Sequence, residues 1–457
     1  MRREIYRCLA ELGYGRGSGS GDGIIGGTGT GTQAGAGTAA DGELLSLWRS
    51  WYEGNVARFH SYRVYNGQKR VLCRRASLGM AKKICEDWAN LLMNERVRIA
   101  AEGDREQKFL DRVLTENRFP LLANRMQELK AALGTAACVP RVCGGRIVLD
   151  GIDAEGIFPL SWENGEITDC AFAVTRREEG RNWVYVQVHH RVRGLYRIEN
   201  LLFASDGDRL EPCPLDALPS LRGLPETLPT GREERQFVTD RMNTVNNLAP
   251  DSPMGLSVFA NAIDQLRGAD VAYDSYVNEF ILGKKRIMLK PEATKDFDGA
   301  PLFDTDELAF YILPEDSGNG SVIREIDMSL RTAEHHQGIQ DMLNLLSVKC
   351  GLGEQYYRFE RGTVRTATEV ISSNSSLYRS VCRHELLLEA SLKELMRILL
   401  RMGCDWLGES VNPETPIRID FDDSILEDRS SEFDRDCRML ELGVMEKEEF
   451  RKKWIVL

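Results

Sequence analysis

The strongest candidate for catalytic chemistry in this 457-residue chain is an acidic run near its C-terminus. The segment IDFDDSILED contains four aspartates, namely Asp420, Asp422, Asp423 and Asp428. Clustered carboxylates can bind a divalent cation, and a magnesium ion held there would support nuclease chemistry. However, two of the four are direct neighbours, and no matching histidine, lysine or further carboxylate cluster accompanies them. A solvated acidic turn after a short strand explains the segment more simply, and we favour that interpretation.

A phosphate-binding loop is the second candidate, because Gly21–Gly26 has the sequence GDGIIG and matches the GxGxxG pattern. In dinucleotide-binding proteins this pattern follows a strand and begins a helix. Residues 13–42 are mostly Gly, Thr, Ser and Ala, a composition that predicts neither element, so the match is expected by chance. The chain also lacks the phosphate loop of ATPases, the HExxH motif and the GxSxG motif. We therefore predict no catalytic residues and no enzyme activity.

Histidine and cysteine spacing gives no metal or cofactor site. The six histidines include two adjacent pairs, His189-His190 and His335-His336. Neighbouring side chains point apart on a strand and about 100° apart on a helix, so such a pair rarely supplies two ligands to one ion. The eleven cysteines are scattered without a CxxC pair, which is typical of reduced thiols in a cytoplasmic protein. We predict no metal and no cofactor.

Length and charge narrow the class of protein further. A chain of this length is long enough for roughly two to four domains. The net charge of −11 and the pI near 5.3 argue against a protein that binds nucleic acid over a broad basic face. No apolar run approaches the ~20 residues of a membrane span, so no membrane contact is expected. The N-terminus, MRREIYRCLAELGYG, is charged throughout and unlike a signal peptide.

The elements that would position any site begin after a predicted flexible, Gly-rich tail over residues 1–42. Apolar periodicity then predicts four helices, at Glu43–Trp51, Met80–Asn94, Glu106–Leu114 and Leu121–Leu133. An antiparallel sheet is predicted over residues 146–210, because NWVYVQVHHRV and GLYRIENLLFA are typical of strands. Asn164-Gly165 lies between two extended runs and predicts a two-residue hairpin turn there.

One predicted helix lies in the segment SLGMAKKICEDWANLLMNERVRI, Ser77–Ile99, which has the residue types of a recognition or cofactor-binding helix. Ser77 is its predicted N-cap. Its apolar residues fall at helical spacing and form one stripe: Ala81, Ile84, Cys85, Trp88, Leu91 and Leu92. We therefore interpret the segment as an amphipathic core helix, with a binding helix as the alternative.

Three longer helices are predicted in the second half. The first covers residues 254–282 after the cap signal Asp-Ser-Pro, and its apolar stripe is interrupted only at Asp270. The second covers Thr332–Lys349. A capping box at Thr366 predicts the third, which its stripe extends to about residue 401, with His384 as a packed or paired residue. Between the first two, FYILPE and SVIREI are predicted strands. The predicted fold class is mixed α+β, mainly α.

These stretches together resemble the portal proteins of tailed bacteriophages, in the branch common among long-tailed phages of Gram-positive hosts. The resemblance covers nearly everything from Leu44 to the C-terminus, and its segments occur in family order. They are FHSYRVYNG, SLGMAKKICEDWANLLMNERVRI, IFPLSWENGEITDCAFA, DSPMGLSVFANAID, YDSYVNEFILGKKRI, LNLLSVKCGLGEQYYRFE, TATEVISSNSSLYR and IDFDDSILEDR. These motifs are long and not compositional, which makes the resemblance specific.

The resemblance implies a ring, usually of twelve subunits, at one capsid vertex, through which DNA is packaged and ejected. The ring would assemble in the host cytoplasm and become part of the virion. Its implied partners are other copies of the chain, the terminase large subunit, the head-tail adaptor protein, the major capsid and scaffold proteins, and translocating double-stranded DNA. The DNA contact is non-specific and transient. A phage DNA-processing nuclease that uses the 420–428 cluster is the alternative function.

The portal fold that the resemblance implies has a helical and β wing, a two-helix stem, a small α/β clip, a tunnel loop, a long helix and a short helical crown. The expected boundaries are 43–250 for the wing, 251–283 and 331–350 for the stem helices, 284–330 for the clip, 351–365 for the tunnel loop, 366–401 for the long wing helix and 402–457 for the crown. The crown is expected to be short or truncated, because the chain stops at Leu457 where relatives usually continue. The Gly-rich tract is also longer than is usual in this family.

The resemblance also implies where the chain meets DNA and proteins. The residues expected to line the DNA channel in the tunnel loop are Arg358, Arg361, Gly362, Thr363 and Arg365. The residues expected to contact terminase and adaptor in the clip are Lys284, Lys285 and Arg286. Alternatively, the loop arginines pair with Glu354 and Glu360 and only hold adjacent loops together. Twelve copies at −11 each give −132, so the ring as a whole would repel DNA, as suits a conduit.

Overall fold

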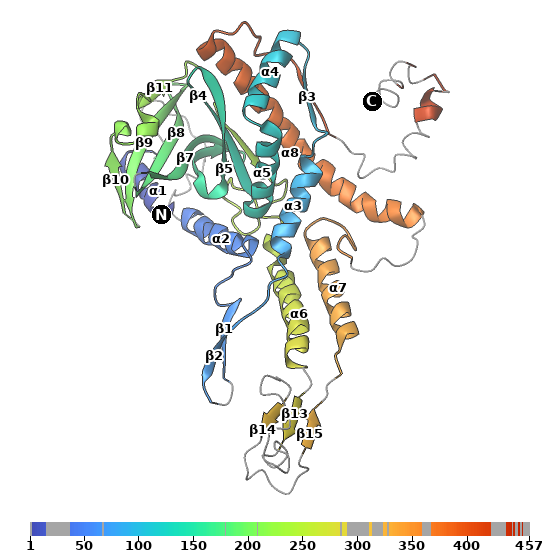
Figure 1. Ribbon diagram of the computed structural model, residues 1–457. Helices are drawn as coiled ribbons and strands as arrows, with labels where there is room; N and C mark the ends of the chain where they lie inside the picture. The colour runs from blue at the N-terminus through green and yellow to red at the C-terminus, as the bar shows by residue number, and fades with distance from the viewer. Residues whose placement is uncertain are drawn as a thin grey trace, which may run out of the picture.

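The computed structural model consists of a broad body, two helices that descend from it side by side, and a small sheet at their far end (Figure 1). It describes residues 2–14, 37–65, 68–178, 180–207, 209–283, 286–289, 310–312, 323–326, 329–358, 367–421, 436–440, 442–443, 447 and 450. Among the described residues, helices account for 45% and strands for 27%, so the fold is mixed α+β and mainly α, as predicted.

The larger sheet of the body is antiparallel, with the strand order β10-β9-β8-β7-β6 and β11 paired to β9. Its strands are β6 (Ile157–Glu163), β7 (Glu166–Glu178), β8 (Arg181–Val192), β9 (Leu195–Asp206), β10 (Arg209–Cys213) and β11 (Thr227–Pro229). In the predicted turn between β6 and β7, Asn164 and Gly165 have φ values of 51° and 78°. A type I′ turn requires positive φ at both positions, which Asn-Gly accommodates. The hairpin is confirmed, but the sheet begins at Ile157 instead of residue 146.

A second sheet of three strands occupies the middle of the body, in the order β12-β4-β5. These strands are β4 (Thr135–Cys143), β5 (Arg146–Asp153) and β12 (Val238–Arg241). Helices α5 (Phe119–Leu133) and α8 (Ala367–Leu407) contact this sheet. Helix α5 ends at Gly134, where φ is 86°, and a Cβ there would lie 2.3 Å from the carbonyl oxygen of Gly255. Only glycine therefore allows these two segments to cross.

Helices α2 (Gly37–Tyr52), α3 (Met80–Leu92) and α4 (Asp104–Glu116) complete the body around α5 and α8 (Figure 1). The predicted helices at residues 80–94, 106–114 and 121–133 are confirmed to within a few residues. Their apolar stripes form one core, in which Ile84, Trp88, Leu110 and Leu399 are almost completely buried. Two short strands, β3 (Arg98–Ala101) and β16 (Ile417–Asp420), pair at the edge of this core.

The helix predicted after the Asp-Ser-Pro signal begins later than expected. Helix α6 covers Ile263–Leu282, after a single 3-10 turn at residues 260–262, whereas the sequence predicted a helix from residue 254. Residues 254–259 instead form an irregular segment packed in the body, where the amide of Gly255 donates to Thr135 Oγ1 (2.8 Å) and that of Val258 donates to the Ala131 carbonyl (2.9 Å). The Asp-Ser-Pro signal forms only a local turn, because burial of Met254, Leu256 and Phe259 outweighs it.

The predicted flexible tail over residues 1–42 is wrong for the segment before residue 15. Helix α1 (Arg2–Glu11) packs on the larger sheet and buries Ile5, Cys8 and Leu9 in a cluster with sheet residues. The Arg2 guanidinium donates to the carbonyls of Ala154, Glu155 and Ile157 at 2.6–2.8 Å. Helix α2 also begins at residue 37, earlier than predicted. Residues 15–36, with most of the Gly-rich tract, lie outside the described residues.

Because α1 is docked, we expect the replacement Leu9→Ala to lower the free energy of unfolding. Leu9 is 1% exposed, and removing its side chain leaves a cavity against the sheet. The expected loss is about 2 kcal/mol, at the low end for a buried leucine because a surface helix can relax into the cavity. Chemical denaturation measures the loss. Leu12→Ala on the exposed side of the same segment is the control, and an equal effect of both variants would show that α1 is not docked.

Helix α7 (Thr332–Lys349) runs back toward the body beside α6 and matches its predicted range (Figure 1). Between α6 and α7 lies a three-stranded sheet of β13 (Arg286–Leu289), β14 (Phe310–Ile312) and β15 (Ile323–Ile326), which confirms the two predicted strands. Strand β13 is central and pairs in parallel with β14 and antiparallel with β15. Among the described residues, no helix is both long and apolar enough to cross a membrane.

Candidate functional site

The candidate site is the stem of α6 and α7, together with the loop that follows α7. The two helices approach closely at Gly268, where a Cβ would lie 2.8 Å from Met342 Sδ. Nearer the small sheet, the Arg331 guanidinium forms two hydrogen bonds with the Glu279 carboxylate, at 3.0 and 2.8 Å. This pair holds the pKa of Glu279 well below its usual range. The stem is therefore fastened at both ends.

Two carboxylates of α6, those of Asp270 and Asp274, fasten the stem to the body by hydrogen bonds. Asp270, the residue that interrupts the predicted apolar stripe, is buried and accepts hydrogen bonds from Ser77 Oγ (3.1 Å) and the Leu78 amide (2.8 Å). It also lies 2.9 Å from His60 Nε2. His60 Nδ1 accepts from the Val56 amide, so the Nε2 atom carries the proton and donates. The interruption of the stripe is thus a buried polar joint between stem and body.

This joint also explains why the predicted N-cap is wrong. Helix α3 begins at Met80 with Gly79 in the N-cap position at φ 70°. The Ser77 hydroxyl accepts a hydrogen bond from the Gly79 amide at 3.1 Å and donates to Asp270. One turn further along α6, Asp274 accepts from the Ala76 amide at 2.9 Å. The segment before α3 is therefore held by the stem and not by a cap of its own.

Helix α3 in turn holds the start of the loop after α7. Trp88, 1% exposed, donates from Nε1 to the carbonyl of Cys350 at 3.1 Å. Its ring meets that of His384 on α8 edge-on, with centroids 4.8 Å apart. The neighbouring Asp87 accepts from the Tyr357 hydroxyl at 2.7 Å, and the Tyr357 carbonyl accepts from Gln340 at 2.6 Å. Both ends of residues 350–357 are thus fixed, and the core interpretation of α3 is confirmed.

The charge state of this anchor is set by burial. Burial raises the pKa of Tyr357 above its ordinary value, and its hydrogen bond to Asp87 raises the pKa further. Burial also raises the pKa of Tyr356 to about 12. Burial, with Lys130 and Arg383 nearby, lowers the pKa of His384 to about 3. Both phenols and the imidazole are therefore uncharged at neutral pH. Tyr357 and His384 act as hydrogen-bonding groups packed in this anchor, which confirms the interpretation of His384.

The structure locates only some of the residues predicted for the tunnel loop and the clip. Arg358 is described and exposed, and Arg286 is the first residue of β13. The predicted positions that lie outside the described residues are Arg361, Gly362, Thr363, Arg365, Lys284 and Lys285. Glu360, a proposed partner of the loop arginines, also lies outside the description, so the alternative of loop–loop pairing stays open.

The acidic run is only partly described. Asp420 ends β16 and accepts a hydrogen bond from Arg418 Nε at 2.7 Å, whereas Asp422, Asp423 and Asp428 lie outside the described residues. Within the part of the chain that the structure describes, no three His, Cys, Asp or Glu side chains are grouped as metal ligands.

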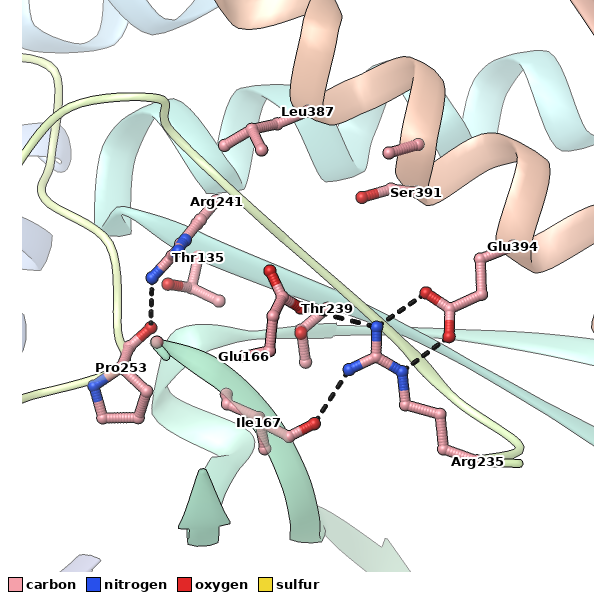
Figure 2. Close-up of a pocket in the computed structure, with 12 residues that line it drawn as sticks. Thr135, Glu166, Ile167, Arg235, Thr239, Arg241, Pro253, Leu387, Ser391 and Glu394 are labelled. Atoms are coloured by element: carbon pink, nitrogen blue, oxygen red, sulfur yellow. Dashed lines mark hydrogen bonds and ion pairs between the residues drawn. The ribbon is translucent and has the colours of Figure 1, made fainter. Parts of the chain in front are cut away.

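A small cavity of about 70 Å³ lies between α8, the β6–β7 turn and the segment that leads into β12. Figure 2 shows that its polar centre is the Arg235 guanidinium, which forms two hydrogen bonds of 2.6 Å with the Glu394 carboxylate. A third bond goes to the Ile167 carbonyl at 2.8 Å. Ligand pockets are usually ~300 Å³ or larger. We interpret this cavity as a joint that ties α8 to the sheets. Arg235 and Glu394 are far apart in sequence, so no local sequence pattern predicts their ion pair.

Comparison with known proteins shows which protein family this chain matches. The chain matches the family model described as phage portal protein, SPP1 Gp6-like, over residues 40–200 and 215–455. No curated protein sequence matches the chain. The matched ranges include the stem, the loop, the small sheet and almost all of the body. Portal proteins are structural, non-enzymatic virion components that take part in DNA packaging. The chain therefore belongs to the SPP1 Gp6-like family of phage portal proteins.

Proposed function

We propose that the chain forms a closed ring, of about twelve subunits, at one vertex of the capsid, and that DNA enters and leaves through its channel. One observation carries this proposal: two fastened helices, α6 and α7, connect a small sheet at one end to an anchored loop at the other (Figure 1). Such an element can hold two contact surfaces at a fixed separation. The ring assembles in the host cytoplasm and remains in the virion.

In this proposal the successive segments of the chain take the parts of a portal. The wing covers residues 43–250, and the stem covers 251–283 and 331–350, with its first helix starting only at Ile263. The clip covers 284–330, the tunnel loop 351–365, the long wing helix 366–401 and the crown 402–457. The wing surface faces the major capsid and scaffold proteins.

The tunnel loop faces the DNA. Its first part is fixed on α3 through Trp88 and Asp87, so α3 sets the depth at which the rest of the loop enters the channel. Arginine side chains suit this position because they contact phosphates without reading sequence. The proposed DNA-facing residues are Arg358, Arg361, Gly362, Thr363 and Arg365.

The clip faces the proteins that bind the portal in turn. Its described sheet of β13, β14 and β15 lies at the end of the stem farthest from the body, which leaves it accessible to the terminase large subunit and later the head-tail adaptor (Figure 1). Lys284, Lys285 and Arg286 form a basic run at the point where α6 passes into β13. In the sequence of an acidic chain, this basic run is the proposed contact for these partners.

The ring is tested by native mass spectrometry of the purified full-length chain. Twelve copies of 51.6 kDa make about 620 kDa, and we expect a narrow distribution of masses around that value. A closed ring has a defined subunit number because each contact repeats by a fixed rotation. Monomers alone, or an unbounded ladder of masses, would contradict the proposal.

A further inference from the structure

The hairpin of β1 (Ser61–Tyr65) and β2 (Arg70–Arg74) projects from the body beside α6 (Figure 1). Apolar side chains are exposed on both of its faces: Tyr65 is 64% and Leu72 is 68% exposed, and Val64 and Val71 are also exposed. An isolated two-stranded hairpin is marginally stable in water, and exposed apolar residues add to this cost. The hairpin therefore has the properties of an element that is completed by a partner.

The charge of the hairpin indicates what kind of partner fits. Every charged residue in its two strands is basic, namely Arg63, Arg70 and Arg74, although the chain carries a net charge of −11. All three arginines are exposed. Arg63 pairs with Leu72 and Arg70 with Tyr65 across the strands, so these four residues share one face. This face combines apolar and basic groups, and it fits a surface that combines apolar and acidic groups.

Helix α7 presents such a surface on the side away from the core. The residues Glu334, Gly338, Asp341, Leu345 and Val348 recur at spacings of four and three, and we call them the outer stripe. Leu345 and Val348 are each 52% exposed, and both acidic residues are exposed. Neither carboxylate forms a hydrogen bond or close ion pair with the part of the chain that the structure describes. The stripe therefore has two acidic groups followed by two apolar ones.

Gly338 gives an independent indication that another chain approaches this stripe. Glycine destabilises a helix interior relative to alanine, so a mid-helix glycine needs a reason. At Gly268 on α6 the reason is internal, because a Cβ would collide with Met342. At Gly338 a Cβ would meet nothing within 4 Å. Packing within the subunit thus explains the first glycine and not the second, which leaves a notch on the outer stripe.

In the view of Figure 1, the hairpin and α7 lie on opposite sides of α6. Complementary patches on opposite flanks form a head-to-tail contact, which is the kind that closes into rings. We propose that the β1–β2 hairpin of one subunit docks on the outer stripe of α7 in a second copy of this chain. Arg63 and Arg70 then face Glu334 and Asp341, and Leu72 enters the notch at Gly338. This inference rests on the proposed ring.

A charge exchange in the full-length chain tests the contact by native mass spectrometry. Arg63→Glu/Arg70→Glu and Glu334→Arg/Asp341→Arg should each lower the ring fraction at least about tenfold, since two attractions per contact become repulsions. The variant with all four changes should regain rings. Arg146→Glu/Arg209→Glu, at two exposed arginines elsewhere on the body, changes the net charge in the same direction and by the same amount as the hairpin variant and should keep rings. Intact rings in both reversed variants, or no recovery in the combined variant, would overturn the contact.

A steric variant provides a second test that does not depend on charge. Gly338→Leu fills the notch and points into open space within the subunit, so the melting temperature should stay the same or rise. The ring fraction should fall. Unchanged ring formation would overturn the placement of Leu72 in the notch. If the proposed ring is wrong, the unaltered chain will form no rings. If only the docking contact is wrong, the unaltered chain will form rings and the variants will form them too.

Discussion

Arg361→Glu/Arg365→Glu is expected to leave ring assembly intact and to lower the yield of DNA-filled heads by at least about tenfold. In the proposed ring of twelve, with two DNA-facing arginines per subunit, the change would convert twenty-four favourable phosphate contacts into repulsive ones. The chain as a whole is acidic, and Arg358 is then the one arginine left in the loop sequence 351–365. Electron microscopy of purified rings and counting of filled and empty heads measure the two outcomes separately.

The matched control is Arg361→Lys/Arg365→Lys, which keeps the charge and should retain most packaging. The alternative interpretation, in which the arginines pair with Glu354 and Glu360, makes the opposite prediction. In that case the reversed variant should fail to close its ring, or lose stability, before any packaging defect appears. Normal rings with normal packaging would contradict both interpretations.

Trp88→Ala is expected to lower the free energy of unfolding by about 3–5 kcal/mol. The indole is almost completely buried between α3, α8 and the start of the loop, and its removal leaves a large cavity. It also leaves the Cys350 carbonyl without its donor. Because the ring lies beside Gly351, where a Cβ would be only 3.4 Å from it, cleavage of residues 350–358 by added protease should accelerate as well.

Two variants separate packing from hydrogen bonding at this site. Trp88→Phe keeps much of the volume but removes the donor, and it should cost less than the alanine variant, with about 1 kcal/mol due to the lost bond. Trp162→Ala, at a tryptophan that is 41% exposed, should change stability by about 0.5 kcal/mol or less. An unchanged melting temperature for Trp88→Ala would show that the anchor described above is wrong.

Local sequence patterns predicted the elements of this fold well where a single local property determines the structure. Asn164-Gly165 predicted its turn because few residue pairs accept positive φ twice. The stripe of α3 predicted burial of Ile84 and Trp88 because helical periodicity places them on one face. The same logic correctly assigned α5 and α7.

The failures occur where a distant segment decides the local structure. The cap signal before residue 254 was overridden by burial of that segment against α5 and β4. Helix α1 was not predicted, because its short apolar face is buried only by packing on the larger sheet, which lies far away in the sequence. Ser77 was assigned as a cap, but Asp270, almost two hundred residues away, determines what it binds.

The candidate site was predictable in outline and not in detail. The order of helix, small sheet, helix and loop follows from the sequence. The anchors do not, because Asp270 and Asp274 accept backbone amides, which any sequence at residues 76–78 would supply. The resemblance to portal proteins carried the functional interpretation further than residue chemistry could, and the family match supports it.

The central claim is that copies of this chain close into a ring around a channel, with α6 and α7 beside the channel. Electron microscopy of the purified full-length chain tests it most directly. We predict end-on views of a closed ring with about twelvefold symmetry and an open centre, and side views with a wide body above a narrower stem. Particles without a central opening, or open filaments in place of rings, would contradict the account.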